Sequence, residues 1–284
     1  MISRRLYRKV VLKDLFPQSI YNAEFIRLEA LKYIPKKYEI MIDPREGLEM
    51  NLDFLRRVFG VDYTQDYFKF LSKAKIVETH KSGVTFGMND LKNQRVRTVE
   101  IPVIQTVNDA STQLHEFMHY IRVTKNPKSC FSLLYSELIN ILVQLLYGEY
   151  CDMNLGLSKD ISVMFSEIDN RIAVDLRRNT SFYDLSYNYH LGPNPTVEEM
   201  ISYNRYLVET LMMCKYFYSS VYALRVLALY QDNRSNIQKK IKALANGGLI
   251  VDDLLKQYNI NMCDDATVDN VVGYMRYRTK QGNK

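Results

Sequence analysis

The pentapeptide from His115 to His119, which reads H-E-F-M-H, constrains this chain more than any other segment. Two of the chain's four histidines fall within it. On a helix, positions i and i+4 lie on the same face and one turn apart, so both imidazoles would point the same way. Two imidazoles placed in this way can bind one metal ion, and the intervening Glu116 can reach a water on that ion. The pattern is what a zinc-dependent hydrolase needs.

The flanking sequence places this motif on a helix. Residues 98–104 predict a short strand, at a sheet edge because it contains Pro102. Four polar residues then offer N-caps for a helix: Asn108, Asp109, Ser111 and Thr112. Apolar residues recur at i, i+3, i+4 and i+7 and form a stripe that would pack into a core: Leu114, Phe117, Met118 and Ile121. Pro127 ends the pattern, which predicts a helix of about three turns.

A catalytic zinc usually takes a third protein ligand, and the next segment supplies a candidate. Residues 130–147 are apolar on nearly every side, which predicts a buried helix, yet Glu137 lies among them. Because an unpaired buried charge is costly, Glu137 needs a partner or a proton. Ser136, Asn140 and Gln144 continue a polar line beside it, which we interpret as the wall of a metal site. Alternatively, Glu137 pairs with an arginine or lies in a gap at the surface.

An H-E-x-x-H helix followed by a glutamate on the next helix resembles the gluzincin metallopeptidases. The stretch from Gln113 to His119 is most similar to the thimet/oligoendopeptidase group, in which glycine is usual at the position of Met118. The resemblance covers roughly residues 96–150. It implies a zinc ion held by His115, His119 and Glu137, with Glu116 as the general base. The spacing from His119 to Glu137 is shorter than in the oligopeptidases, and no acidic residue follows Glu137 by one turn.

The remaining pattern predicts a mainly α, zincin-like fold with a small three-stranded sheet before the motif helix. Helices are expected over 19–34 and 52–73, and strands over 75–80, 84–88 and 96–107, the first two joined near residues 81–83. From residue 109 onward nearly all of the chain is expected to be helical. A capping box at Thr196 opens one helix, and Asn246-Gly247-Gly248 precedes a last pair.

We interpret residues 1–284 as a single zincin-like domain with three successive parts. Residues 1–74 form a helical N-terminal region, 75–107 the small sheet, and 108–284 the helical region that carries the metal site. The apolar fraction of 47% is ample for one core at this length.

Composition favours a cytoplasmic protein that does not enter a membrane. The N-terminal segment is basic and lacks the apolar stretch of a secretory signal. Charged or polar residues interrupt both long apolar segments, 130–151 and 206–230. None of the four cysteines makes a C-x-x-C pair, which fits a reducing compartment: Cys130, Cys151, Cys214 and Cys263.

Peptide hydrolysis also needs a group that stabilises the developing oxyanion, and tyrosine or histidine can provide it. Tyr187 and His190 lie in a segment that reads as a loop, and Tyr218 lies in a tyrosine-rich helix that faintly resembles one in the oligopeptidases. The alternative for each tyrosine is a core position with its hydroxyl bound to a neighbour.

The sequence therefore predicts a zinc-dependent peptide hydrolase with one zinc per chain and a peptide or protein as substrate. The strand over residues 99–105 would bind an extended substrate at the sheet edge. The alternative is a helical interaction or nucleic-acid-binding protein whose metal site is degenerate or structural. Both ends of the chain are basic, within a net charge of +6. Because such ends are more often solvated tails, we do not expect nucleic acid as a partner.

Overall fold

The computed structural model describes residues 22, 25–26, 28–29, 40–78, 81–127, 137–154, 194, 196–261 and 264–282. Its elements, in chain order, are α3 (Pro44–Val58), α4 (Val61–Leu71), β1 (Ala74–Val77), β2 (Gly83–Thr85), α5 (Met88–Lys92), β3 (Thr98–Pro102), α6 (Val107–Lys125), α7 (Leu138–Asn154), α10 (Val197–Asp232), α11 (Arg234–Ala245), α12 (Val251–Gln257) and α13 (Asp265–Gly282). The predicted class is confirmed, because the chain is mainly α-helical and a small mixed sheet precedes α6.

The sheet has the order β1-β3-β2, which corrects two expectations. The strands β1 and β2 do not pair with each other, because β1 runs parallel and β2 antiparallel to β3. The strand that contains Pro102 is therefore central rather than at an edge, and Pro102 is tolerated because it is the last residue of β3. Because β1 covers residues 99–102 on one side and β2 covers residues 98–100 on the other, β3 is not an edge strand. The pairing of a substrate with residues 99–105 stays a prediction.

The helix expected over residues 52–73 is two helices. Gly60 separates α3 from α4, and its φ of 101° lies in a region that side-chain-bearing residues rarely adopt. The α3 helix also begins earlier than predicted, at Pro44, where the Asp43 side chain accepts hydrogen bonds from the backbone N–H groups of Arg45 and Glu46. A proline at the first helical position after an aspartate cap is a well-formed helix start.

The motif helix α6 is 19 residues long and begins at Val107, earlier than the predicted caps. Its N-cap is Thr106, whose hydroxyl accepts from the Asp109 N–H, while the Asp109 carboxylate accepts from the Thr106 N–H at 2.9 Å. Asp109 therefore closes a capping box rather than capping the helix itself. The four residues of the predicted apolar stripe are all fully buried: Leu114, Phe117, Met118 and Ile121.

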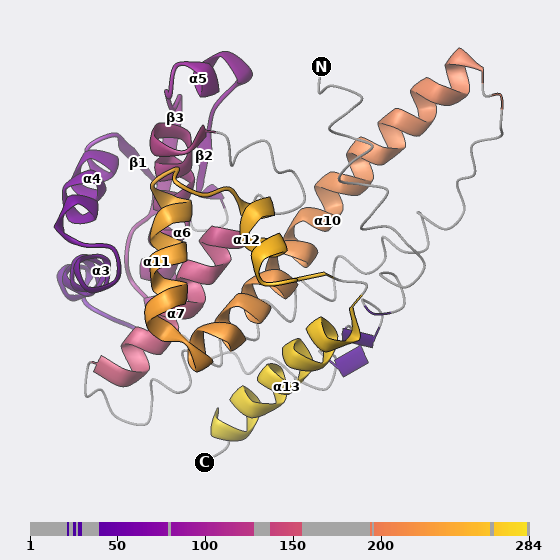
Figure 1. Ribbon diagram of the computed structural model, residues 1–284. Coiled ribbons are helices and arrows are strands. Elements are labelled where there is room, and N and C mark those ends of the chain that lie inside the picture. The colour runs from indigo at the N-terminus through magenta and orange to yellow at the C-terminus, as the bar shows by residue number, and fades with distance from the viewer. Residues whose placement is uncertain are drawn as a thin grey trace.

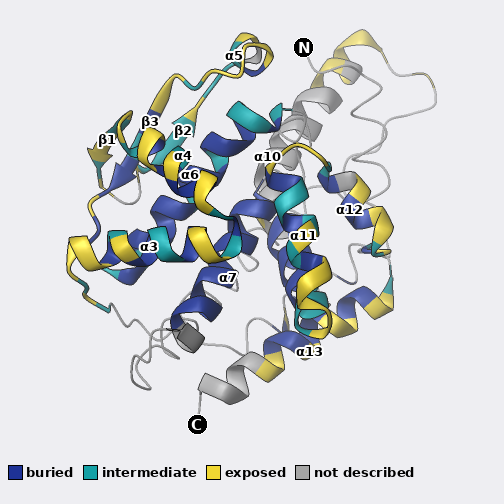
Figure 2. Ribbon diagram, turned by 60° about the vertical axis from the view of Figure 1, so that its left-hand side comes forward, coloured by how far each residue is buried: buried dark blue, intermediate teal, exposed yellow. Residues whose placement is uncertain are grey.

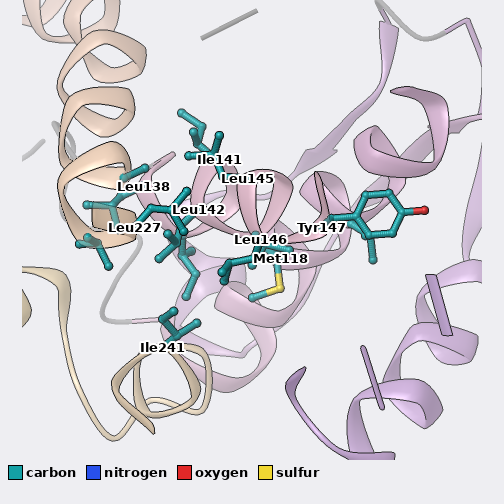
Figure 3. Packing of buried hydrophobic residues seen from close by; sticks show 14 of the residues in the cluster. Met118, Leu138, Ile141, Leu142, Leu145, Leu146, Tyr147, Leu227 and Ile241 are labelled. Carbon is teal, nitrogen blue, oxygen red and sulfur yellow. The ribbon is translucent and has the colours of Figure 1, made fainter. Parts of the chain in front are cut away.

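Helix α7 packs against α6, α10 and α11. Figure 1 places α6 and α7 between α3 and α4 on one side and α10 on the other. Figure 2 shows α7 as an almost continuously buried element, in contrast to α3, whose outer face is exposed. Figure 3 shows its leucines in one buried cluster with Leu227 of α10, Ile241 of α11 and Met118 of α6. The side chains of Leu142 and Leu145 are completely buried, as the sequence predicts for a helix that is apolar on nearly every side.

The C-terminal part follows the expected plan. The predicted capping box at Thr196 opens α10, and α11 ends at Ala245, immediately before the Asn246-Gly247-Gly248 break. The helices α12 and α13 then form the expected last pair. None of the helices in the described part of the chain combines the length and apolar character that crossing a membrane requires.

Candidate metal centre

His115 and His119 lie one turn apart on α6, with their ring centroids 5.0 Å apart. Their positions are fixed from the opposite face of the helix, where Leu114 and Phe117 are fully buried. The two imidazoles keep 15% and 18% of their side-chain surface exposed. The motif therefore lies at the margin of the core, with its backbone anchored and its imidazoles turned toward α7.

Glu137 meets both histidines, as predicted. One carboxylate oxygen, Oε2, lies 3.3 Å from Nε2 of His115 and 3.0 Å from Nε2 of His119. Glu137 immediately precedes α7, and its backbone N–H donates to Oγ of Ser219 on α10 at 3.2 Å. Its carbonyl accepts from the Ile141 N–H and so begins the helical hydrogen bonding of α7. The carboxylate is 3% exposed, which excludes the alternative that Glu137 lies at the surface.

Gln144 fixes the orientation of the His115 ring. Its Nε2 donates to Oγ of Ser111 at 3.2 Å, and its Oε1 lies 2.9 Å from Nδ1 of His115. Because an amide oxygen only accepts, Nδ1 of His115 must carry the proton of this hydrogen bond. A neutral His115 then has a lone pair on Nε2, which is the arrangement of a metal-binding imidazole held by an outer partner.

In this tautomer, Nε2 of His115 is stable beside Glu137 only if a positive charge lies between them. A lone pair there faces the Glu137 carboxylate at 3.3 Å, and two acceptors at that distance repel each other unless positive charge lies between them. A proton on each imidazole would meet the need, at the cost of two cationic rings 5.0 Å apart beside Glu137. One divalent cation satisfies both nitrogens and the carboxylate together.

The same contacts shift the pKa values of Glu137 and His115. Burial by itself raises the pKa of the Glu137 carboxyl, but the charges and hydrogen bonds of His119 and His115 outweigh burial and hold this pKa well below its ordinary value. Burial by itself lowers the pKa of His115, whereas its bond to Glu137 and the charge of Glu116 raise that pKa above its ordinary value. Glu137 is therefore an ionised carboxylate, as a metal ligand must be.

The three side chains fit a zinc ion. Their ligand atoms all lie within 4.8 Å of one another. Ligand atoms at the corners of a tetrahedron with bonds of about 2.0–2.1 Å are roughly 3.3 Å apart. The measured distances from Glu137 Oε2 to the two Nε2 atoms, 3.3 and 3.0 Å, match that spacing closely. Two imidazoles and one carboxylate are also a known donor set of catalytic zinc.

Glu116 lies beside His115, and one of its carboxylate oxygens accepts no hydrogen bond from the described residues. The residue is 7% exposed, and its Oε2 has no hydrogen-bond partner among the described residues. A buried carboxylate oxygen without a donor is costly, so such an atom in a native protein calls for a functional explanation. A water or cation held at the His115–His119–Glu137 group would supply the missing partner.

Of the other predicted site residues, only Tyr218 lies in the described part of the chain. It is fully buried on α10, where it stacks on Tyr222 with the centroids 6.3 Å apart. Tyr187 and His190 lie outside the described residues. Ser219, which accepts a hydrogen bond from the Glu137 N–H, was not identified from the sequence, where nothing marks it except its position next to Tyr218. Ser111 was predicted as a helix cap, whereas its hydroxyl accepts a hydrogen bond from Gln144.

Comparisons of the chain with protein-family models, with curated proteins and with solved structures found no match. The gluzincin resemblance therefore depends on the motif and on the contacts of Glu137.

Proposed function

We propose that the protein is a zinc-dependent peptide hydrolase in which His115, His119 and Glu137 hold one zinc ion. The observation that carries the proposal is the convergence of both motif imidazoles on one buried carboxylate oxygen, at 3.3 and 3.0 Å. That contact joins an H-E-x-x-H helix to a glutamate immediately before the next helix, which resembles the arrangement by which the gluzincins bind zinc.

The chemistry divides between the metal and Glu116. When bound, zinc supplies a Lewis acid that polarises the scissile carbonyl and lowers the pKa of the attacking water. Glu116 accepts a proton from that water as its oxygen bonds to the carbonyl carbon. As the C–N bond breaks, Glu116 donates the proton to the leaving amine. Its uncommitted Oε2, next to the ligand His115, supports this role.

Three residues are candidates for stabilising the oxyanion: Tyr187, His190 and Tyr218. Each remains a proposal, and kinetics of the tyrosine-to-phenylalanine and His190→Ala variants would separate them. A lowered kcat with unchanged zinc content is the expected signature of the residue that binds the oxyanion.

The proposal is tested with Glu116→Gln and His115→Ala. The first should bind zinc as the wild type does and lose hydrolysis of a quenched fluorescent peptide library, because glutamine cannot accept the proton. The second should lose zinc. The matched control is Glu149→Gln, which changes another buried glutamate, on α7, whose Oε1 accepts from the Gln231 amide at 3.4 Å. Full hydrolysis by Glu116→Gln would refute the assignment of the base.

The same measurements separate the alternative of a structural metal site. A site that only stabilises a helical interaction protein would bind zinc and show no hydrolysis in the wild type. Zinc sites of that kind are closed by four protein ligands, whereas catalytic sites keep one position for water. Whether a fourth side chain completes the coordination therefore decides between a structural and a catalytic site.

A further inference from the structure

The side-chain amide of Asn140 touches two of the candidate ligands, His119 and Glu137. Its Nδ2 is 3.0 Å from Oε2 of Glu137, and it is 2.9 Å from Nε2 and 3.1 Å from Nδ1 of His119. An atom almost equally far from both ring nitrogens at this range cannot lie in the plane of the ring, because it would collide with the carbon between them. The amide nitrogen therefore lies over the face of the His119 ring.

The charge of Glu137 decides which end of the Asn140 amide points inward. The two ends have nearly the same shape, but only the nitrogen can donate to a carboxylate. Oδ1 in the same place would set two acceptors 3.0 Å apart. With the nitrogen inward, Oδ1 has no hydrogen-bond partner among the described residues, although Asn140 is completely buried. An apolar residue of similar size would leave no such polar atom unsatisfied, so the contacts of Nδ2 are what this asparagine contributes.

This placement lets Asn140 and a metal ion act on the same two side chains without competing. A metal on His119 lies in the plane of the ring, along the lone pair of a ring nitrogen, whereas the amide approaches from the face. A carboxylate oxygen has two lone pairs, so Oε2 of Glu137 can bind a metal with one and accept the Asn140 N–H with the other. The amide nitrogen has no lone pair to offer a metal, so Asn140 occupies none of the coordination positions.

The two histidines are held in different ways. The His115 ring is fixed in its own plane, because its Nδ1 lies 2.9 Å from the Gln144 amide oxygen. Within the described part of the chain, His119 makes its polar contacts only with Glu137 and Asn140. Since Glu137 is itself a candidate ligand, the contact that limits rotation of the His119 ring about its Cβ–Cγ bond is the amide on its face.

We propose that Asn140 is a positioning residue of the metal centre, which holds the His119 ring and the Glu137 carboxylate in the orientation for metal binding without being a ligand. Partners of this kind, one shell outside the ligands, usually contribute to metal affinity. The inference rests on the proposed function only in that His115, His119 and Glu137 hold a metal.

The test is Asn140→Leu, which keeps most of the volume and removes both N–H groups. Its Zn²⁺ dissociation constant, measured in competition with a chelating dye, should rise roughly 10–100-fold. Bound Co²⁺ should also show a shifted and weaker ligand-field absorption, because the His119 ring is no longer fixed. A residue that served only the stability of the fold would lower the unfolding free energy of the metal-free protein and leave both readouts unchanged. If leucine prevents folding, Asn140→Ala removes the same contacts and replaces it.

The matched control is Asn51→Leu. Asn51 is also completely buried, with an Oδ1 that has no hydrogen-bond partner among the described residues, but its amide nitrogen contacts Tyr67 and the Ala110 carbonyl. This variant should lose unfolding free energy and keep the wild-type Zn²⁺ affinity and Co²⁺ spectrum. Equal affinities and spectra in the wild type and Asn140→Leu would overturn the inference and leave the three-ligand site intact. A wild type that binds neither Zn²⁺ nor Co²⁺ would overturn both the inference and the proposed function.

Discussion

Replacing Glu137 with glutamine should abolish the stabilisation of the protein by zinc. One oxygen of this carboxylate receives three contacts, from His115, His119 and Asn140, at 3.3, 3.0 and 3.0 Å. Glutamine has nearly the same shape but no charge, and it presents either a weaker acceptor or an N–H group to the same neighbours. Both the ion pairing and the metal affinity should therefore fall together.

The magnitude has two parts. Breaking a buried charge interaction by changing one partner costs about 3–5 kcal/mol, and this loss should be present without metal. Zinc at about 100 times its dissociation constant stabilises a protein that binds it only when folded by about 2.7 kcal/mol. For a chain of 284 residues that stabilisation corresponds to a rise in Tm of roughly 4–5 °C. The wild type should show this rise, and Glu137→Gln should show almost none.

The assay is thermal unfolding of tag-free protein, first stripped with a chelator and then returned to saturating Zn²⁺. Glu149→Gln is again the control, because it neutralises a buried glutamate of α7 that is 7% exposed and away from the histidines. It should lower Tm without changing the response to zinc. A Glu137→Gln variant that keeps the full zinc-dependent rise would show that Glu137 is not a ligand.

Three further predictions concern the scaffold. Gly247→Ala should cost more than about 2 kcal/mol of unfolding free energy, because φ is +83° and a Cβ would lie 2.8 Å from the Lys125 carbonyl oxygen. The control Gly248→Ala should change the unfolding free energy little, and urea unfolding measures both variants. Phe117→Ala, at a fully buried ring, should cost about 3–5 kcal/mol in the same experiment. Burial raises the pKa of the Asp66 carboxyl, but hydrogen bonds and charge, first from Lys125, outweigh it and lower that pKa below 3.8. Lys125→Met should therefore cost about 1 kcal/mol near pH 7. The difference from wild type should shrink as acid protonates Asp66, and the part due to the Lys125 ammonium over the Tyr63 ring, 4.5 Å from its centroid, should remain.

The site could be predicted further than its surroundings because its signals are local. Two histidines one turn apart and a single carboxylate in an apolar segment are each visible in a short window of sequence, and burial of that carboxylate requires a partner or a proton for it. The strand order could not be predicted from such local signals. Nothing within residues 74–102 states that β3 lies between β1 and β2, because a parallel and an antiparallel neighbour impose similar patterns on such short strands.

The predicted helix boundaries were wrong where a single residue or bridge interrupted a periodic apolar pattern. The apolar spacing of residues 52–73 continues across Gly60, yet its φ of 101° ends α3 and starts α4. At α6 the predicted caps were plausible side chains, but after β3 the backbone pairs with residues 40–42 as far as Thr106, so the helix begins immediately after that bridge. Backbone conformation decided the boundary at Gly60, and a backbone bridge together with the Thr106–Asp109 capping box decided the start of α6.

The polar line on α7 shows what sequence reasoning lacked at the site. Two amides were visible, but which faces which histidine depends on the register of two antiparallel helices. A step of four residues forward along α6, from His115 to His119, corresponds to a step of four backward along α7, from Gln144 to Asn140. Each histidine is therefore matched with one amide, turn for turn. Because the helices cannot slide by one residue without separating both pairs, the two histidine–amide contacts and the packing of the helices stabilise the same register.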